Sequence, residues 1–282
     1  MGRKWLVLLF APACLFPDLG DLQGDAASDV SAPDVMDAKP IESGTEAGND
    51  AANDGQGDVD AGPEAGFCAS LGGSHALCED FDTTTAFSSQ FTNVHLSTNG
   101  ALGNDTAIVK TAPRSLLATI PAEGTKLGDD AYMTRLFGGS ATKATYSFDF
   151  RVDSLPTGGQ SGVFAAIVFD DSLPTHHSLA IYLTDTYSAL EESFTVDGGT
   201  VYKDHTLSIT VPLNKWTHVS FDVNATTHVC NASIDGQPSV VNAPIDLSWK
   251  ASTAAIDLGL TYVNSETTAW QARYDDVVFD FQ

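Results

Sequence analysis

Residues 144–152, with the sequence ATYSFDFRV, indicate the fold of this chain. Apolar or aromatic residues stand at the even positions from Tyr146 to Val152, and polar residues stand at the odd positions between them. This alternation with a period of two is typical of an antiparallel strand that buries one face. Residues 217–223 (THVSFDV) show the same alternation. Both segments therefore predict strands whose apolar side chains face a common core.

Other short segments rich in β-branched and aromatic residues lie on either side of these two, separated by Gly, Asn, Asp and Pro. We expect strands at residues 107–110, 115–120, 131–137, 162–169, 178–184, 191–196, 205–211, 228–234, 255–263 and 273–281. No segment of helix length shows a period of 3.6. The sequence therefore predicts an all-β fold, a two-sheet antiparallel jelly-roll sandwich over residues 67–282. Residues 163–169 (VFAAIVF) are apolar throughout and predict a central strand covered on both faces.

Residues 1–14 (MGRKWLVLLFAPAC) have a cationic start and a short apolar run, as an export signal does. The run is too short for a membrane-spanning helix, which needs about 20 residues. Residues 11–14 (APAC) resemble a bacterial lipobox, which implies lipidation of Cys14; an ordinary secretory signal is the alternative. Both predict export, either to the cell envelope as an outer-membrane-anchored lipoprotein or as a secreted protein. The only membrane association expected is a lipid anchor.

Residues 15–66 hold 13 acidic residues and one basic residue, Lys39, and lack hydrophobic periodicity. We expect a disordered acidic linker, because such a segment cannot bury enough apolar surface to offset the entropy of ordering it. The whole chain has a net charge of −24. This charge excludes nucleic acid as a partner, because affinity for phosphates depends on Lys and Arg.

Four cysteines occur, at positions 14, 68, 78 and 230. Cys68 and Cys78 bracket a short loop in a chain expected to be exported, so a local disulfide between them is predicted. Cys230 is in phase with Ala232 and Ile234, on the face of a strand that we expect to be buried. Cys230 is therefore predicted to be a buried free thiol.

Four motifs occur in a fixed order: residues 77–82 (LCEDFD), 216–219 (WTHV), 229–236 (VCNASIDG) and 273–279 (RYDDVVF). Together they resemble the concanavalin A-like lectin/glucanase superfamily, and within it the laminin G-like jelly-roll domain of exported bacterial proteins. The resemblance implies that the first and last strands lie side by side. It also implies a structural calcium site formed by Glu79, Asp80, Asp275 and Asp276. The alternative is that these four acids face solvent and bind no metal.

The related glycoside hydrolases carry a Glu-x-Asp-x-x-Glu strand, and this chain lacks it. Glu191 and Glu192 are adjacent, so they are expected to face opposite sides of a strand and not to form a catalytic pair. No recognisable lyase motif surrounds any of the arginines at 114, 135, 151 and 273. We therefore expect no catalytic residues and predict that the chain is not an enzyme.

Trp249 and Trp270 stand beside turns rich in Ser and Thr and are predicted to be exposed platforms that stack on sugar rings. His176 and His177 follow Asp170 and Asp171, a group that could bind a transition metal or form a polar turn. The predicted function is a binding module for a glycan or an extracellular protein. The alternatives are a polysaccharide-active enzyme, hydrolase or lyase, with an unrecognised active site, and a structural surface protein without a small ligand.

Overall fold

The computed structural model describes residues 66–83, 86, 88–122, 128–170, 176–196, 199–264 and 267–282. The predicted export signal, the lipidation site Cys14 and the linker up to residue 65 lie outside the described residues. Within those ranges, no helix is long and apolar enough to cross a membrane.

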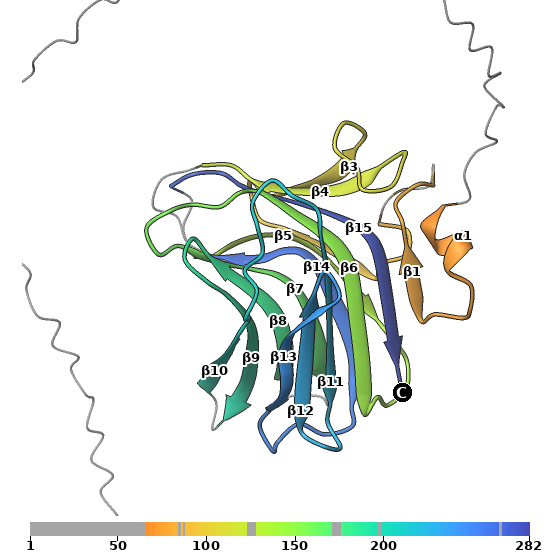
Figure 1. Ribbon diagram of the computed structural model, residues 1–282, viewed down its shortest axis with the longest axis vertical. Helices are drawn as coiled ribbons and strands as arrows, with labels where there is room; N and C mark the ends of the chain where they lie inside the picture. Colours follow the sequence, from red (N-terminus) through yellow and green to blue (C-terminus); the bar gives the residue numbers. More distant parts are fainter. Residues whose placement is uncertain are drawn as a thin grey trace, which may run out of the picture. The chain divides into compact units, whose positions relative to one another are not determined.

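Two antiparallel sheets pack face to face, as the predicted jelly-roll sandwich requires (Figure 1). In sheet A the strand order is β13 (Gln237–Pro244), β12 (Val229–Ile234), β11 (Thr217–Asn224), β6 (Lys143–Ser154), β15 (Trp270–Phe281), β4 (Ser115–Ile120) and β3 (Ala101–Asp105), and β1 (Leu77–Glu79) also pairs with β15. In sheet B the order is β10 (Gly199–Thr206), β9 (Ser188–Val196), β8 (His176–Thr184), β7 (Ser161–Asp170), β14 (Thr253–Val263), β5 (Asp129–Leu136) and β2 (Asn93–Leu96). A short helix, α1 (Phe67–Leu71), precedes β1.

The alternating segment of residues 144–152 lies within β6, near the centre of sheet A, and its apolar face forms much of the core. Tyr146, Phe148, Phe150 and Val152 are all fully buried. Phe148 meets Phe221 of β11 edge to face, with ring centroids 6.3 Å apart. Burial of each such ring contributes roughly 2 to 3 kcal/mol to folding. The period of two therefore predicted correctly which face of β6 is inside.

Several edge elements differ from the prediction. Residues 107–110 form no strand, and residues 207–211 follow the end of β10 and bury Leu207 and Val211 in the core. The strands β1, β2, β3 and β13 were not predicted. They are short or exposed strands mostly at sheet edges, where both faces meet solvent and the apolar alternation is lost.

The strand β7 is central in sheet B, and nearly all of its described side chains are buried on both faces, as predicted. Phe164, Ile167 and Phe169 face the core between the sheets. Ala166 and Val168 face outward, where they belong to a second, smaller apolar cluster and line a groove. The outer face of β7 therefore forms an apolar groove floor.

The start of the domain is fixed as predicted. Cys68 and Cys78 form a disulfide, and Cys230 is a buried free cysteine. The strand β1 pairs with β15, with Cys78 opposite Val278, so the first and last strands of the sandwich lie side by side.

Candidate functional site

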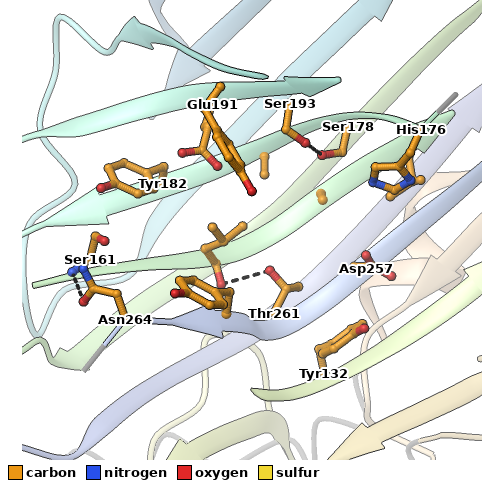
Figure 2. A pocket seen from close by; sticks show the side chains of 16 residues that line it. Tyr132, Ser161, His176, Ser178, Tyr182, Glu191, Ser193, Asp257, Thr261 and Asn264 are labelled. Carbon is orange, nitrogen blue, oxygen red and sulfur yellow. Dashed lines mark hydrogen bonds between the residues drawn. The ribbon is translucent and has the colours of Figure 1, made fainter. Parts of the chain in front are cut away.

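A groove of about 610 Å³ crosses the outer face of sheet B; we call it the sheet B groove. Residues of β5, β14, β7, β8, β9 and β10 line it (Figure 2). Its volume lies within the range of sites that bind small molecules or short stretches of a polymer.

The strand register places one row of side chains across this groove. Glu191 of β9 is opposite Ala180 of β8, Ala180 is opposite Ala166 of β7, and Ala166 is opposite Asp257 of β14. The two alanines leave a low floor between two carboxyl groups. Three strand spacings separate Glu191 from Asp257, which corresponds to roughly 14 Å between their Cα atoms. The groove can therefore hold several sugar units side by side between these acids.

Asp257 is the centre of a cluster of groups that can exchange protons. The hydroxyl of Thr134 donates a hydrogen bond of 2.6 Å to Asp257 Oδ1. Burial raises the pKa of Asp257 above its ordinary value, although this hydrogen bond opposes the shift. Figure 2 shows Tyr132, Asp257 and His176 toward the same end of the groove.

Tyr132 lies next to Asp257 on β5, the neighbouring strand. Its ring stacks on the imidazole of His95 of β2, with centroids 4.5 Å apart. Burial, together with the negative charge of Asp257, raises the pKa of Tyr132 to about 12. Tyr132 therefore keeps its proton at neutral pH and can donate it.

Glu191 forms the other side of the groove. Burial and the negative charge of Asp204 of β10 raise the pKa of Glu191 to about 7. Tyr187 donates a hydrogen bond of 2.7 Å to Asp204, and its ring contacts that of Tyr182. Glu192, the next residue, faces the interior, as the alternation predicted.

None of the described residues that line the groove is a Lys or Arg. The four arginines considered from the sequence bind elsewhere: Arg114 to the carbonyl of Thr83, Arg135 to that of Gln90, Arg151 to Asp153, and Arg273 to Asp105 and Asp153. The groove therefore presents carboxyl, hydroxyl and imidazole groups and no permanent cation.

The prediction that Trp249 and Trp270 are exposed platforms is wrong, because both are fully buried. Trp249 donates a hydrogen bond of 2.8 Å to Glu192 Oε1 and packs against Phe169. Trp270 packs against Phe164, with ring centroids 6.0 Å apart. Polar neighbours in the sequence suggested exposure, but these large rings fill space between the two sheets.

His176 and His177 face opposite sides of β8 and do not form a metal site together. His176 lines the groove, whereas His177 is buried and Nε2 lies 2.9 Å from the hydroxyl of Ser248. Asp171 lies outside the described residues.

The four predicted calcium ligands lie near the pairing of β1 with β15, and all are buried. The backbone N–H of Phe81 donates to Glu79, and that of Cys68 donates to Asp80. These amides already occupy oxygens that an ion would need.

Asp275 and Asp276 are engaged in a similar way by the segment before β4. Asp275 accepts hydrogen bonds from the backbone N–H groups of Lys110 and Thr111, and Asp276 accepts one from the Thr111 hydroxyl. Across the part of the chain that the structure describes, no group of three or more His, Cys, Asp or Glu is arranged to hold a metal ion. The geometry thus gives calcium no support, and calcium binding stays a prediction.

The reasoning from sequence missed the groove residues Tyr132 and Asp257, and His95, which stacks on Tyr132. One signal was present: Asp257 is a charged residue within the apolar stretch of residues 254–260 (AAIDLGL). A carboxyl at such a position is costly unless a partner or a function accounts for it. The partners could not be found, because they lie on distant strands.

The sequence matches no family model and no curated protein. The structure is similar to an endo-beta-1,4-glucuronan lyase from the fungus Trichoderma reesei, with a TM-score of 0.59, 14% identity and coverage of 74% of this chain and 96% of that one. It is similar to alginate lyase vAL-1 from a Chlorella virus, with a TM-score of 0.52, 8% identity and coverage of 74% and 100%. It is also similar to the cellulose-induced protein Cip1, with a TM-score of 0.50, 10% identity and coverage of 72% and 96%.

These similarities contradict the prediction that the chain is not an enzyme. That prediction depended on the missing hydrolase motif, and two of these three structures are lyases. The missing motif is therefore no ground for excluding catalysis in a sandwich of this kind. At these identities the comparison establishes the fold alone: the chain shares the two-sheet jelly-roll sandwich of these proteins.

Proposed function

We propose that this chain is an exported polysaccharide lyase that binds a uronate-containing glycan in the sheet B groove. The observation that carries the proposal is the cluster of Asp257, Tyr132 and His176 at one end of the groove, where His95 stacks on Tyr132 from outside the lining. The similarity of the fold to a glucuronan lyase and an alginate lyase supports it.

The reaction is a β-elimination. A base removes the proton from the carbon that bears the uronate carboxylate, and the electron pair of that C–H bond forms a double bond to the neighbouring carbon. The bond from that carbon to the glycosidic oxygen breaks, and the oxygen leaves with its electron pair and takes up a proton. The groove must therefore supply one proton acceptor and one proton donor.

Tyr132 is assigned as the donor, because its phenol lines the groove beside Asp257 and carries a proton at neutral pH. His176 is assigned as the acceptor, because it lines the groove at the same end and an imidazole nitrogen can act as a general base. Asp257 stabilises the protonated form of Tyr132 through its negative charge. His95 holds the phenol ring in place by stacking, and is thus a positioning residue.

The test uses the purified full-length chain with glucuronan, alginate and a neutral glucan. Elimination produces new reducing ends together with unsaturated ends that absorb ultraviolet light, whereas hydrolysis produces reducing ends alone. We expect both signals with at least one uronate polymer and neither with the neutral glucan. We expect Tyr132→Phe to lower the rate by about 100-fold or more and to leave binding intact.

Tyr182→Phe is the matched control, because Tyr182 lines the groove away from the cluster. Its rate should stay within a few-fold of that of the unmodified chain. Reducing ends without unsaturated ends would replace the lyase proposal by a hydrolase. Binding without any cleavage would return the chain to the class of glycan-binding modules.

A further inference from the structure

Glu191 is a carboxyl group in the sheet B groove that has no compensating cation. No hydrogen bond or ion pair engages its carboxyl within the described ranges. Its register partners are Ala180 on β8 and Asp204 on β10. Lys203 and His205, on either side of Asp204, point to the opposite face of the sheet, where Lys203 is partly exposed and His205 is buried; they lie 3.6 Å and 3.4 Å from Glu192.

Among the residues that the structure describes, the groups that face Glu191 are therefore neutral or negative. Ser178, Ala180 and Tyr182 face it from β8, Ala166 lies beyond them on β7, and Tyr202 and Asp204 face it from β10. Asp204 is the one charged group among these, and its nearest donor is the hydroxyl of Tyr187. Burial beside a like charge disfavours the ionised form, in agreement with the raised pKa of about 7.

We infer that Glu191 is a specificity residue that, in its protonated form, donates a hydrogen bond to a carboxylate of the bound uronate chain. This inference rests on the proposed function and identifies how a groove without arginine recognises an anionic polymer. A carboxylic acid bound to a carboxylate forms a short, strong O–H···O⁻ hydrogen bond. Two ionised carboxylates at the same place would repel each other. Uronate binding at Glu191 is therefore coupled to proton uptake.

The position of Glu191 sets which kinetic constant it controls. The residue stands roughly 14 Å from Asp257 across the sheet, so it contacts a sugar other than the one that is cleaved. Its hydrogen bond is present in the bound substrate and in the transition state alike. Removing it therefore raises KM and leaves kcat nearly unchanged.

The pH dependence follows from the state of Glu191. The donor is present below a pH of about 7, and above this value it is lost as the carboxyl ionises. Because binding takes up one proton there, affinity for the uronate chain falls by up to about tenfold per pH unit. We expect Asp204→Asn to move the start of this loss to lower pH, since the neighbouring negative charge raises the pKa of Glu191.

The experiment uses the full-length chain from about pH 5 to about pH 9. Calorimetry measures the affinity for glucuronan and alginate oligosaccharides, and the cleavage assay measures KM. Three proteins are compared: the unmodified chain, Glu191→Gln and Glu191→Ala. Glutamine donates a hydrogen bond at every pH, so the affinity of Glu191→Gln should not fall above about pH 7. Alanine neither donates nor repels, so Glu191→Ala should bind weakly throughout. Thr195→Ala, on the same face of β9 but outside the groove lining, is the control and should keep the unmodified profile.

The alanine variant decides between donation and simple repulsion. If Glu191→Ala binds as tightly as the unmodified chain below pH 7, Glu191 only repels the substrate when charged, and the inference is wrong. An affinity of the unmodified chain that does not vary with pH would also overturn it. Calorimetry measures binding whether or not cleavage occurs. The lyase proposal fails if no unsaturated product forms, and the role of Glu191 fails if the binding results differ from those above. The two failures are therefore distinguished.

Discussion

Glu191 and Glu192 are chemically identical neighbours that the two faces of β9 place in opposite environments. Glu192 accepts hydrogen bonds from Trp249 and from the backbone of Asp246. Burial alone would raise the pKa of Glu192, but these bonds and His205 hold it below its ordinary value. Glu191 has no such donors and shifts in the other direction. At the scale of a residue, the environment and not the residue type decides whether a carboxyl is structural or available to a ligand.

Gly162, near the start of β7, allows a close approach of Trp270. A Cβ atom at Gly162 would stand 2.7 Å from the indole ring, and that ring is buried and cannot move to solvent. We predict that Gly162→Ala lowers the free energy of unfolding by about 1 to 3 kcal/mol, as overpacking of a core does. Unfolding in urea measures this. Gly103→Ala is the matched control, because nothing lies within 4 Å of its added Cβ, and it should change stability by less than about 1 kcal/mol. Equal stability of both variants would contradict the prediction.

At the scale of an element, β1 depends on a crosslink. It has three residues and pairs with β15 alone. The disulfide joins Cys78, the middle residue of β1, to Cys68 of α1 across a sequence separation of 10. In the unfolded chain the disulfide restricts the loop between Cys68 and Cys78. Without the disulfide this loop is free to move in the unfolded chain.

We predict that Cys68→Ser combined with Cys78→Ser lowers the free energy of unfolding by about 3 kcal/mol, the value expected for a loop of this size. Denaturant unfolding with and without a reductant measures this. Reductant should destabilise the unmodified chain and have no effect on the double variant, because Cys230 is buried and has no partner cysteine among the described residues. A double variant as stable as the oxidised chain would show that β1 does not need the crosslink.

The calcium prediction belongs to the scale of the whole molecule, because its ligands come from the first and last strands of the domain, which pair with each other. Burial raises the pKa of Asp275 to about 8 and that of Asp276 to about 6, so a cation held there would relieve an unfavourable burial of charge. We retain calcium as a proposal on this ground alone. Added calcium should raise the melting temperature of the full-length chain, and excess chelator should lower it. A melting temperature that neither reagent changes would remove the proposal, and Asp275→Asn is the variant that should abolish any calcium effect.

Much of the fold could be predicted from the sequence. The alternation in β6 and β11 gave the buried faces, and the short spacing of Cys68 and Cys78 gave the disulfide. These features are local, because side chains on a strand change face at every residue and a short loop keeps its ends together. Edge strands such as β2 and β13 escaped prediction, because solvent on both sides removes the pattern.

By itself, the sequence determined that this protein is a β-sandwich and which strand faces turn inward. Only the tertiary structure decided where its chemistry lies. The order of strands in sheet B brings Glu191, Asp257 and Tyr132 to one groove, and the packing of the two sheets buries Trp249 and Trp270. The physical reason is that alternation depends on neighbouring residues, whereas strand pairing joins segments far apart in the chain, so the neighbours of a side chain are fixed only when the sheets form.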